Sequence, residues 1–386
     1  MTRPAKILFY VQYLLGIGHV RRAALNVRAM CDAGLQVDVV FGGAPVEHIS
    51  FAPARMHYLD PVKTSDLGFT GLVKVDGSEL TEADKASRTR ALLSICDALQ
   101  PDLIVTETYP FGRRQMRFEL KPLLRWSAEQ THKPVVISSI RDILQARRDE
   151  RELETVELVQ RYYDHILVHG DPEFTPLQAS FSRTEQIADK IAYSGYVCPP
   201  PLPAVSREKL IVVSAGGGAT GRDILQTAAQ LQHSGFAADH EWLLITGPNM
   251  PPEDKAFIQT FQGPRLEVVE LADDFVGCLN RAAASVSMAG YNTVMDLLQT
   301  SVPAVVVPFE AVKETEQLAR SELLEAQDLL KIIRENQLSP ETLKRALEQV
   351  IGQSGQRPQI DIEGAATTAR LVKQWAEAGT AYQENP

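Results

Sequence analysis

Short apolar segments alternate with longer amphipathic segments along the first half of the chain. Each apolar segment has the length and the continuous hydrophobic character of a strand that is buried on both faces, as in a parallel sheet. Each amphipathic segment is long enough to cross back over such a sheet as a helix. The predicted strands are Lys6–Gln12, Gln36–Gly42, Asp102–Glu107, Pro134–Ile140 and His165–His169. The predicted helices are His19–Ala33, Glu79–Leu99, Gln115–Gln130 and Asp149–Tyr163.

The alternation stops at a proline-rich segment, Ser194–Lys209, and begins again after it. Because clustered prolines cannot occupy the interior of a helix or a sheet, this segment predicts a linker over residues 199–209. The strands predicted beyond it are Leu210–Ala215, Trp242–Gly247, Leu266–Glu270, Ala284–Met288 and Pro303–Pro308. The helices predicted there include Gly221–His233, Asn292–Gln299 and Glu314–Ala326.

This pattern predicts an α/β chain with two doubly wound, Rossmann-like domains, residues 1–198 and 210–360. Ligands of such sheets bind beyond the carboxyl ends of the strands, so we expect the chemistry in a cleft between the domains. A last helix is predicted over Ile362–Ala378, in a C-terminal segment of residues 361–386. We expect this helix to pack back on the first domain.

The composition narrows the class of protein. The 386 residues exceed the roughly 250–300 at which a single core stops growing, which agrees with two domains. The formal net charge of -10 argues against a general nucleic-acid-binding protein, which needs a basic surface. The four cysteines lack the spacing of metal ligands, so we expect reduced thiols and no zinc. No apolar run reaches the roughly 18 residues of a membrane span, and Gln12 interrupts the first one, so we expect a cytoplasmic protein.

A stripe of basic residues follows the third predicted strand. It can contact anionic lipid headgroups at the inner face of a membrane, or it can be the solvated face of a helix. The second interpretation is favoured for such a stripe. Its members are Arg113, Arg114, Arg117, Lys121 and Arg125.

The first strand leads into a glycine-containing loop, Tyr13–Arg22, that precedes a helix. Gly16 and Gly18 allow a ligand to approach the backbone closely, and the helix amides can hold an anion. His19 then lies at the mouth of the predicted cleft, where an imidazole can act as a general base on a hydroxyl or a water. The alternative is a helix-capping loop with an incidental histidine, and the local sequence does not decide between the two.

A second glycine-rich loop, Ser214–Gly221, follows the first strand of the second domain. Small residues leave the backbone amides open to a diphosphate, and two hydroxyls add donors. A tight turn between strand and helix is the alternative, but four glycines exceed what a turn needs. The candidate donor-binding residues are Ser214, Gly216, Gly217, Gly218 and Thr220.

Two later segments repeat the arrangement of strand, loop and helix. In Met288–Asp296, Gly290 begins a turn that Asn292 or Thr293 can cap, and Asp296 can accept ribose hydroxyls or stabilise the helix dipole. In the other, the strand Pro303–Pro308 leads towards Glu316 and Gln317. Their polar groups can contact sugar hydroxyls, or they belong to an ordinary solvated helix start.

Taken together, these motifs resemble the GT-B glycosyltransferases of family 28, the group that contains the peptidoglycan lipid-intermediate N-acetylglucosaminyltransferase. The chain is most similar to a bacterial subgroup of predicted glycosyltransferases that open with FYVQYLLGIGHVRRA. The resemblance spans most of the chain. It rests on the loop Gly16–His19, SAGGGATG at 214–221, AGYNTVMDLL at 289–298, and VPAVVVPFE with ETEQ within 302–317.

The resemblance implies a transfer of a sugar from a nucleotide-diphospho-sugar, with UDP as the expected nucleotide, to a hydroxyl acceptor. It implies an inverting mechanism without a metal or other cofactor, and we find no pair of aspartates placed to hold a metal. Ser214 and Gly216–Gly218 would approach the diphosphate, with support from Asn292 and Thr293. The resemblance implies that Asp296 binds ribose, at a position where most members carry Glu. It also implies that Glu316 and Gln317 contact ribose or sugar hydroxyls.

The acceptor side follows two strands of the first domain. Arg113, Arg114 and Arg141 can meet an anionic acceptor, or each can belong to a structural ion pair. Glu107 and Asp142 can orient His19 or act as an alternative base. The acceptor is a sugar, a lipid-linked sugar or a small molecule.

Two other functions compete with glycosyl transfer. A nucleotide-sugar hydrolase of the pseudaminic-acid-pathway type has a similar glycine–histidine loop and uses water in place of the acceptor. A noncatalytic nucleotide-sugar-binding protein would keep the loops of the second domain and lose the base, so His19 argues against it. A nucleotide-sugar epimerase is disfavoured, because its acidic and histidine residues are not found.

Overall fold

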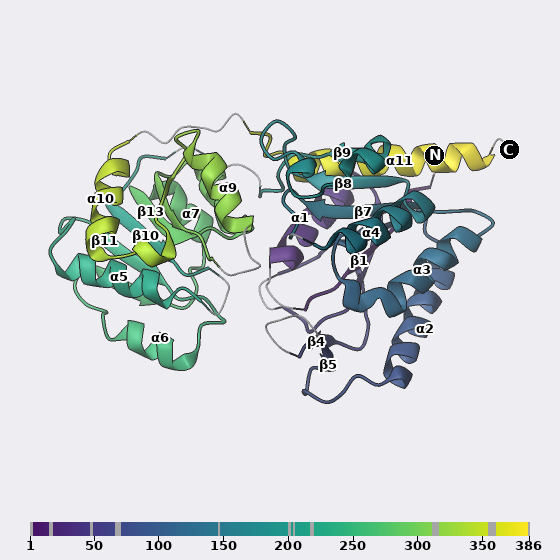
Figure 1. Ribbon diagram of the computed structural model, residues 1–386, viewed down its shortest axis with the longest axis horizontal. Coiled ribbons are helices and arrows are strands. Elements are labelled where there is room, and N and C mark those ends of the chain that lie inside the picture. Colours follow the sequence, from purple (N-terminus) through teal and green to yellow (C-terminus); the bar gives the residue numbers. More distant parts are fainter. Residues whose placement is uncertain are drawn as a thin grey trace. The chain divides into compact units, whose positions relative to one another are not determined.

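The computed structural model describes residues 3–14, 18–46, 49–65, 71–145, 147–199, 202–203, 205–216, 220–310, 316–353 and 360–384. The chain forms two compact units (Figure 1). The first unit comprises Met1–Val197 and Asp361–Pro386, and the second comprises Cys198–Ile360. Each unit is built on its own parallel sheet, which confirms the predicted pair of Rossmann-like domains.

The sheet of the first unit has seven parallel strands in the order β3-β2-β1-β6-β7-β8-β9. Successive residues of β1 point to opposite faces, as expected for a strand. Leu8 and Tyr10 join one hydrophobic cluster, and Ile7 and Phe9 join the other. The strands are β1 (Lys6–Val11), β2 (Gln36–Phe41), β3 (Arg55–Tyr58), β6 (Leu103–Glu107), β7 (Val135–Arg141), β8 (His165–His169) and β9 (Ile191–Tyr193).

Helices cover both faces of this sheet (Figure 1). One face is covered by α2 (Glu82–Leu99), α3 (Arg117–Glu129) and α4 (Asp149–Tyr162). The other is covered by α1 (Gly18–Asp32) and α11 (Gly364–Glu384). Val372 of α11 is fully buried in the same cluster as Val27 of α1, so the C-terminal helix packs on the first unit as predicted.

Several elements of the first unit were not predicted. β3 has an exposed or half-buried residue at every position, and β9 is three residues long. The hairpin of β4 (Val62–Thr64) and β5 (Leu72–Lys74) is equally short. The predicted start of α2 at Glu79 was wrong, because Thr81 caps the helix in a capping box with Asp84.

The sheet of the second unit has six strands in the order β12-β11-β10-β13-β14-β15, all parallel. α5 (Arg222–His233), α6 (Pro252–Gln259) and α10 (Pro340–Val350) contribute to the main hydrophobic cluster, and α7 (Phe275–Arg281), α8 (Tyr291–Thr300) and α9 (Glu316–Glu325) complete the unit. The strands are β10 (Leu210–Ser214), β11 (Glu241–Ile245), β12 (Leu266–Val269), β13 (Ala284–Met288), β14 (Ala304–Val307) and β15 (Lys331–Ile332).

Both sheets reverse their strand order at one place, between β1 and β6 in the first unit and between β10 and β13 in the second. In doubly wound sheets this switch point opens a crevice at the carboxyl ends of the strands, where ligands bind. Four predicted site residues lie at the carboxyl ends of these strands or just after them, namely His19 at the start of α1, Glu107 at the end of β6, Ser214 at the end of β10 and Gly290 before α8. The topology therefore predicts one candidate ligand-binding position in each unit.

Candidate functional site

His19 and Glu107 meet at the switch point of the first unit. His19 is the second residue of α1, and Glu107 is the last residue of β6. His19 Nδ1 lies 2.8 Å from Glu107 Oε1. The carboxylate is 1% exposed, whereas the imidazole keeps 21% of its side-chain surface exposed. The structure thus joins two of the predicted catalytic residues and leaves the histidine partly accessible.

Two residues that the sequence reasoning did not select complete this arrangement. Arg22 donates from Nη2 to Glu107 Oε1 at 2.6 Å, and it lies 3.2 Å from His19 Nδ1. The Thr108 hydroxyl donates to the same carboxylate oxygen at 2.7 Å. The spacing of His19 and Arg22 by three residues on one helix was the available signal for Arg22. Nothing in the local sequence indicated Thr108.

The backbone of Thr108 is strained. Its φ of 67° lies in the left-handed region, which a β-branched residue rarely adopts. Its amide donates to the carbonyl of Ser139 at 2.8 Å, so the neighbouring strand helps to hold this conformation. Backbone strain of this kind is concentrated at functional sites.

Charge and burial set the protonation of the pair. Burial lowers the pKa of His19 to about 4, although the Glu107 carboxylate acts in the opposite direction. Burial alone would raise the pKa of Glu107, but His19, Arg22 and Arg113 outweigh it and hold that pKa below its usual range. At neutral pH the pair therefore consists of a neutral imidazole and an ionised carboxylate.

This protonation state defines what the pair can do chemically. A carboxylate only accepts hydrogen bonds, so His19 Nδ1 carries the proton and donates it to Glu107. The lone pair of the neutral ring is then on Nε2. A histidine held in one tautomer by a buried carboxylate is equipped to take a proton from a hydroxyl group or a water.

Asp142, the third predicted catalytic residue, lies in a different environment. It is fully buried just after β7, and its Oδ2 accepts a hydrogen bond of 3.1 Å from the Tyr196 hydroxyl. A Cβ added at Gly170 would lie 2.8 Å from the Asp142 Cβ, so the site around Asp142 is tightly packed. Of the two predicted carboxylates, Glu107 is the one that the structure places on His19.

The predicted acceptor-side arginines divide into two groups. Arg114 is exposed and lies 3.3 Å from Glu154, which also binds Lys121 at 3.0 Å, so part of the basic stripe is paired. Arg113 and Arg141 lie close enough to each other for their charges to interact. Gly18 is the first residue of α1, and Gly16 lies outside the described residues.

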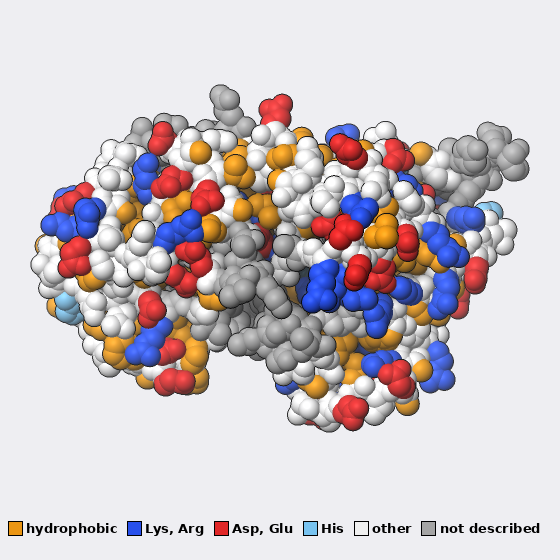
Figure 2. Space-filling view, viewed as in Figure 1, with side chains coloured by type: hydrophobic (Ala, Val, Ile, Leu, Met, Phe, Trp, Pro, Cys, Tyr) orange, Lys and Arg blue, Asp and Glu red, His pale blue; other side chains and the backbone are white. Residues whose placement is uncertain are grey.

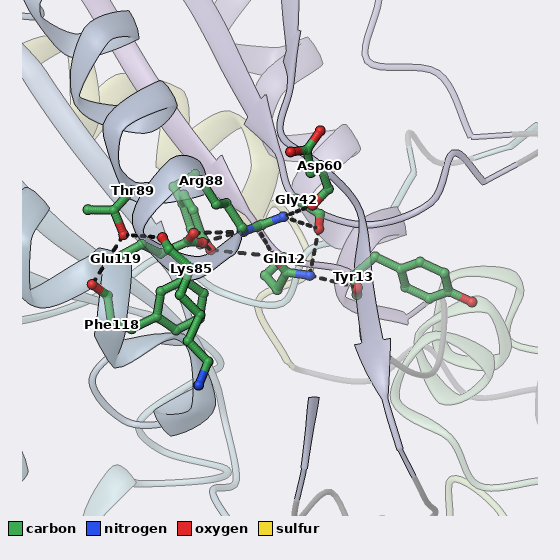
Figure 3. Close-up of polar contacts among 10 residues, drawn as sticks. Gln12, Tyr13, Gly42, Asp60, Lys85, Arg88, Thr89, Phe118 and Glu119 are labelled. Atoms are coloured by element: carbon green, nitrogen blue, oxygen red, sulfur yellow. Dashed lines mark hydrogen bonds and ion pairs between the residues drawn. The ribbon is translucent and has the colours of Figure 1, made fainter. Parts of the chain in front are cut away.

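A second buried polar network holds the strand that leads to His19 (Figure 3). Arg88 and Glu119 form a bidentate pair, with distances of 2.7 and 3.0 Å, and both are fully buried. Arg88 also donates to Gln12 Oε1 at 2.6 Å and to the carbonyl oxygens of Gly42 and Asp60. The Gln12 amide in turn donates to the carbonyl of Tyr13 at 2.9 Å. This network fixes the end of β1 immediately before the loop to α1.

In the second unit, Ser214 ends β10 and its hydroxyl accepts a hydrogen bond of 3.1 Å from the Gly216 amide. Thr220 is exposed, and its hydroxyl lies 3.6 Å from the sulfur of Met288 at the end of β13. The switch-point strands β10 and β13 are thus connected at their carboxyl ends. Gly217 and Gly218 lie outside the described residues.

The N-terminus of α8 lies at the same switch point. Gly290 precedes the helix and supplies no capping side chain to its first amides. A Cβ added at Gly290 would meet no atom within 4 Å. Asn292 and Thr293 in the first turn are half-buried. A helix N-terminus with free space suits an anionic group such as a phosphate.

The remaining predicted donor residues are more enclosed. Asp296 is 1% exposed, one turn further into α8. Glu316 is buried at the start of α9 and binds Arg320 at 2.6 Å, and the Arg320 guanidinium lies 5.2 Å from the ring of Tyr291. Gln317 accepts a hydrogen bond of 3.1 Å from the Phe309 amide through Oε1. These contacts join the start of α9 to the start of α8.

Among the described residues, no group of three or more His, Cys, Asp or Glu side chains gathers in a way that could hold a metal ion. Within the same part of the chain, none of the helices combines the length and apolar character needed to cross a membrane.

Residues 210–374 match the model of the glycosyltransferase family 28 C-terminal domain. The chain thus carries a family 28 C-terminal domain. As a whole it has a fold similar to that of the calicheamicin glycosyltransferase CalG4, with a TM-score of 0.62, 17% identity, and coverage of 100% of this chain and 99% of the other. It is also similar in fold to Acinetobacter baumannii MurG, with a TM-score of 0.59, 14% identity, and coverage of 97% and 100%.

Sequence relatives of this chain carry one shared name, UDP-N-acetylglucosamine--N-acetylmuramyl-(pentapeptide) pyrophosphoryl-undecaprenol N-acetylglucosamine transferase. The protein from Rippkaea orientalis is 27% identical over 197 residues, which cover 50% of this chain and 53% of the relative. The protein from Yersinia enterocolitica is 30% identical over 151 residues, which cover 38% and 42%. The chain thus spans about half the length of the relatives that it matches, or less.

Proposed function

We propose that this protein transfers a sugar from a nucleotide-diphospho-sugar to a hydroxyl acceptor. The observation that carries the proposal is the buried Glu107 carboxylate on a partly exposed, neutral His19. The pair belongs to a chain whose residues 210–374 match a glycosyltransferase domain. Such a pair supplies the base that a glycosyl transfer requires.

In the proposed reaction, His19 Nε2 takes the proton of the acceptor hydroxyl. The acceptor oxygen forms a bond to the anomeric carbon while the bond from that carbon to the diphosphate oxygen breaks on the opposite side. The configuration of the anomeric carbon is therefore inverted, and the proton stays on the imidazole. Glu107 stabilises the resulting imidazolium, as a buried carboxylate does for a catalytic histidine.

The departing diphosphate gains negative charge and needs stabilisation in the second unit. The amides at the start of α8 and the glycine loop after β10 are suited to supply it. We propose that they do so without a metal ion or other cofactor. A chelator such as EDTA is then expected to leave the rate unchanged, and a loss of activity that Mg²⁺ or Mn²⁺ restores would show a metal requirement.

The names of the relatives suggest the donor. Their shared name specifies a UDP-sugar as donor and an N-acetylglucosamine transfer. For this chain we propose a UDP-sugar and a hydroxyl acceptor on a sugar, a lipid-linked sugar or a small molecule. Transfer is favoured over hydrolysis because all these relatives are named as transferases, although the same base can activate water.

The first experiment is a thermal-shift screen with UDP, other nucleoside diphosphates and their sugars. A ligand that binds only the folded state raises the melting temperature by mass action, so one nucleotide family is expected to do so. His19→Ala should keep this shift, because His19 lies in the other unit, and should lower turnover by about 10²–10⁴-fold, the usual contribution of a general base.

Two results would contradict the proposal. If no nucleoside diphosphate shifts the melting temperature of the folded protein, the donor site is wrong. If His19→Ala turns over donor and acceptor at the wild-type rate, the base is wrong. Release of free sugar from the donor with no dependence on any acceptor would identify the hydrolase instead.

A further inference from the structure

Arg113 is a half-buried arginine with unsatisfied nitrogen atoms in its side chain. It follows β6 by six residues, and its backbone is held in the left-handed region, with φ 56° and ψ 31°. Its Nε and Nη2 atoms are buried and have no hydrogen-bond partner among the described residues. Because a buried charge without a partner costs several kcal/mol, such a group is retained where a ligand completes it or where function requires it.

Other arginines increase the positive charge around Arg113. Arg141 lies in electrostatic range of both Arg113 and Arg147. Burial together with repulsion from Arg151, Arg114 and Arg141 lowers the pKa of Arg147 to about 10. The arginines therefore repel one another in a partly enclosed region that follows β6 and β7. On the face that Figure 2 shows, Lys and Arg side chains gather beside α3 and α4 of this unit.

Three carboxylates near this region already have partners. Glu107 Oε1 binds His19 and Arg22, while Glu107 Oε2 is buried without a hydrogen-bond partner and its charge attracts Arg113. Glu152 accepts hydrogen bonds from the amide and hydroxyl of Ser182 at 3.1 and 2.6 Å. Glu154 binds Arg114 and Lys121. Within the described residues, none of these carboxylates satisfies the buried Nε and Nη2 of Arg113.

The region adjoins the proposed base. Arg113 lies close enough to His19 and Glu107 to change the pKa of both. An anion held by Arg113 would therefore bring the molecule that carries it next to His19. Guanidinium groups bind the planar or tetrahedral oxygens of carboxylates and phosphates in bidentate fashion.

We propose that Arg113, with Arg141 and Arg147 beside it, binds a carboxylate or phosphate group of the acceptor and so positions the acceptor hydroxyl at His19. This inference rests on the proposed function for the identity of the bound molecule as acceptor. It defines the acceptor as an anion. Arg113 is then a specificity-determining residue for the acceptor, and the donor-binding loops of the second unit are independent of it.

The test uses the full chain and two simple probes, sodium phosphate and sodium acetate, against sodium chloride at equal ionic strength. The probes are compared on wild type, Arg113→Met and the matched control Arg125→Met, which removes an exposed arginine of α3. Phosphate, acetate or both are expected to raise the melting temperature of wild type and of Arg125→Met. In Arg113→Met the anion-induced rise in melting temperature is expected to be smaller than in wild type. The probe that acts shows whether the group is a phosphate or a carboxylate.

Stability without added anion gives a second measurement. Removing an unpaired buried charge is expected to leave the melting temperature of Arg113→Met equal to or above that of wild type. A lower melting temperature would show that Arg113 has a partner inside the protein, such as a water shared with Glu107, and would overturn the proposal. Equal anion-induced shifts in Arg113→Met and wild type would overturn it as well.

The outcome is separable from that of the proposed function. Binding of UDP to the second unit is measured in the same screen, and Arg113→Met is expected to leave it unchanged. A UDP shift without an Arg113-dependent anion shift would refute the anionic acceptor alone. Once an acceptor is known, Arg113→Met is expected to raise its KM by at least tenfold, while Arg113→Lys recovers part of the loss.

Discussion

At the scale of single residues, Arg22 controls the pair of His19 and Glu107. Its guanidinium lies on both, so it stabilises the ionised carboxylate and disfavours a second positive charge on the imidazole. A base that is neutral at physiological pH is ready to accept a proton without first losing one. The cost is a weaker base, and the carboxylate behind it offsets part of that loss.

The pH dependence of the reaction should reflect this environment. Because the base acts when it is neutral and its pKa is lowered to about 4, kcat/KM should show no rise near pH 6.5, the ordinary pKa of histidine. Activity is lost as the pH falls through about 4. In Arg22→Met the acidic limb should move to higher pH, because Arg22 lowers the pKa of His19. The check is a pH–rate profile with circular dichroism at each pH, and a wild-type midpoint near 6.5 would contradict it.

Glu107→Gln tests the carboxylate. The amide keeps the shape but loses the charge that fixes the tautomer of His19, so kcat should fall by about 10²–10⁴-fold. The buried Arg22 also loses the carboxylate that it binds at 2.6 Å, which should lower the free energy of unfolding by about 3–5 kcal/mol. Enzyme assays and urea denaturation measure the two effects. If turnover stays within a factor of three of wild type, Glu107 has no part in activating the base.

At the scale of elements, the start of α8 offers a test of the donor site. Gly290 has φ -61° and ψ 147°, which alanine adopts freely, and its Cβ would meet no atom within 4 Å. Gly290→Ala should therefore keep the stability of wild type, yet weaken UDP binding by at least tenfold if the diphosphate approaches these amides. Isothermal titration with UDP measures this effect, and unchanged affinity would place the diphosphate elsewhere.

Gly221→Ala is the contrasting control. Gly221 has φ 113°, and an added Cβ would lie 2.6 Å from the Cβ of Ala215. Gly221→Ala should therefore lower the stability of the fold, so that a loss of UDP binding in this variant would reflect the fold. The two glycines thus separate an effect on the fold from an effect on binding.

The buried pair of Arg88 and Glu119 lets α2 and α3 support the end of β1. Arg88→Met should lower the free energy of unfolding by about 3–5 kcal/mol, because it takes the counter-charge from the buried Glu119 carboxylate, to which the Tyr10 hydroxyl still donates. The double variant Arg88→Met with Glu119→Leu should recover part of this loss, since an apolar pair needs no counter-charge. Urea denaturation of the three proteins checks both statements. A single variant within 1 kcal/mol of wild type would mean that water reaches the pair.

The elements that the sequence predicted are the ones with long apolar or amphipathic runs. The strands β1, β6 and β14 were predicted because their residues form continuous apolar, buried runs. The strands β3 and β15 were not predicted, because they lie at the edges of their sheets and have few buried positions. The same limit applies to the candidate site. The sequence predicted His19 and Glu107 as site residues. It could not predict the contact of Arg22 with Glu107, because that contact depends on β6 lying beside β1, which brings together residues far apart in the chain.

At the scale of the whole molecule, the second unit is one continuous stretch of sequence that is inserted between the two parts of the first unit. The chain leaves the first unit after Val197 and returns at Asp361. The two crossing points are joined, because the Tyr196 amide donates to the carbonyl of Asp361 at 2.7 Å and the Gly364 amide donates to that of Tyr196 at 2.9 Å. The chain thus leaves the first unit and returns to it at neighbouring positions.

Truncation after Ile360 should affect the units unequally. It removes Ala369, Val372 and Ala376 from the core around α1, which should cost the first unit on the order of 5 kcal/mol. The second unit keeps all of its strands, so UDP should still stabilise it. Differential scanning calorimetry with and without UDP separates the two transitions. Loss of the UDP effect together with the first unit would show that the units unfold as one.

The position of α11 also has a consequence for biosynthesis. A ribosome makes the sheet of the first unit before the second unit, but it makes α11, the helix that packs on α1, after the second unit. During the synthesis of the second unit, the part of α1 that α11 covers is therefore open to water, to chaperones and to neighbouring nascent chains. The unit that begins to fold earlier is thus completed later, and we expect its newly made form to be prone to aggregate.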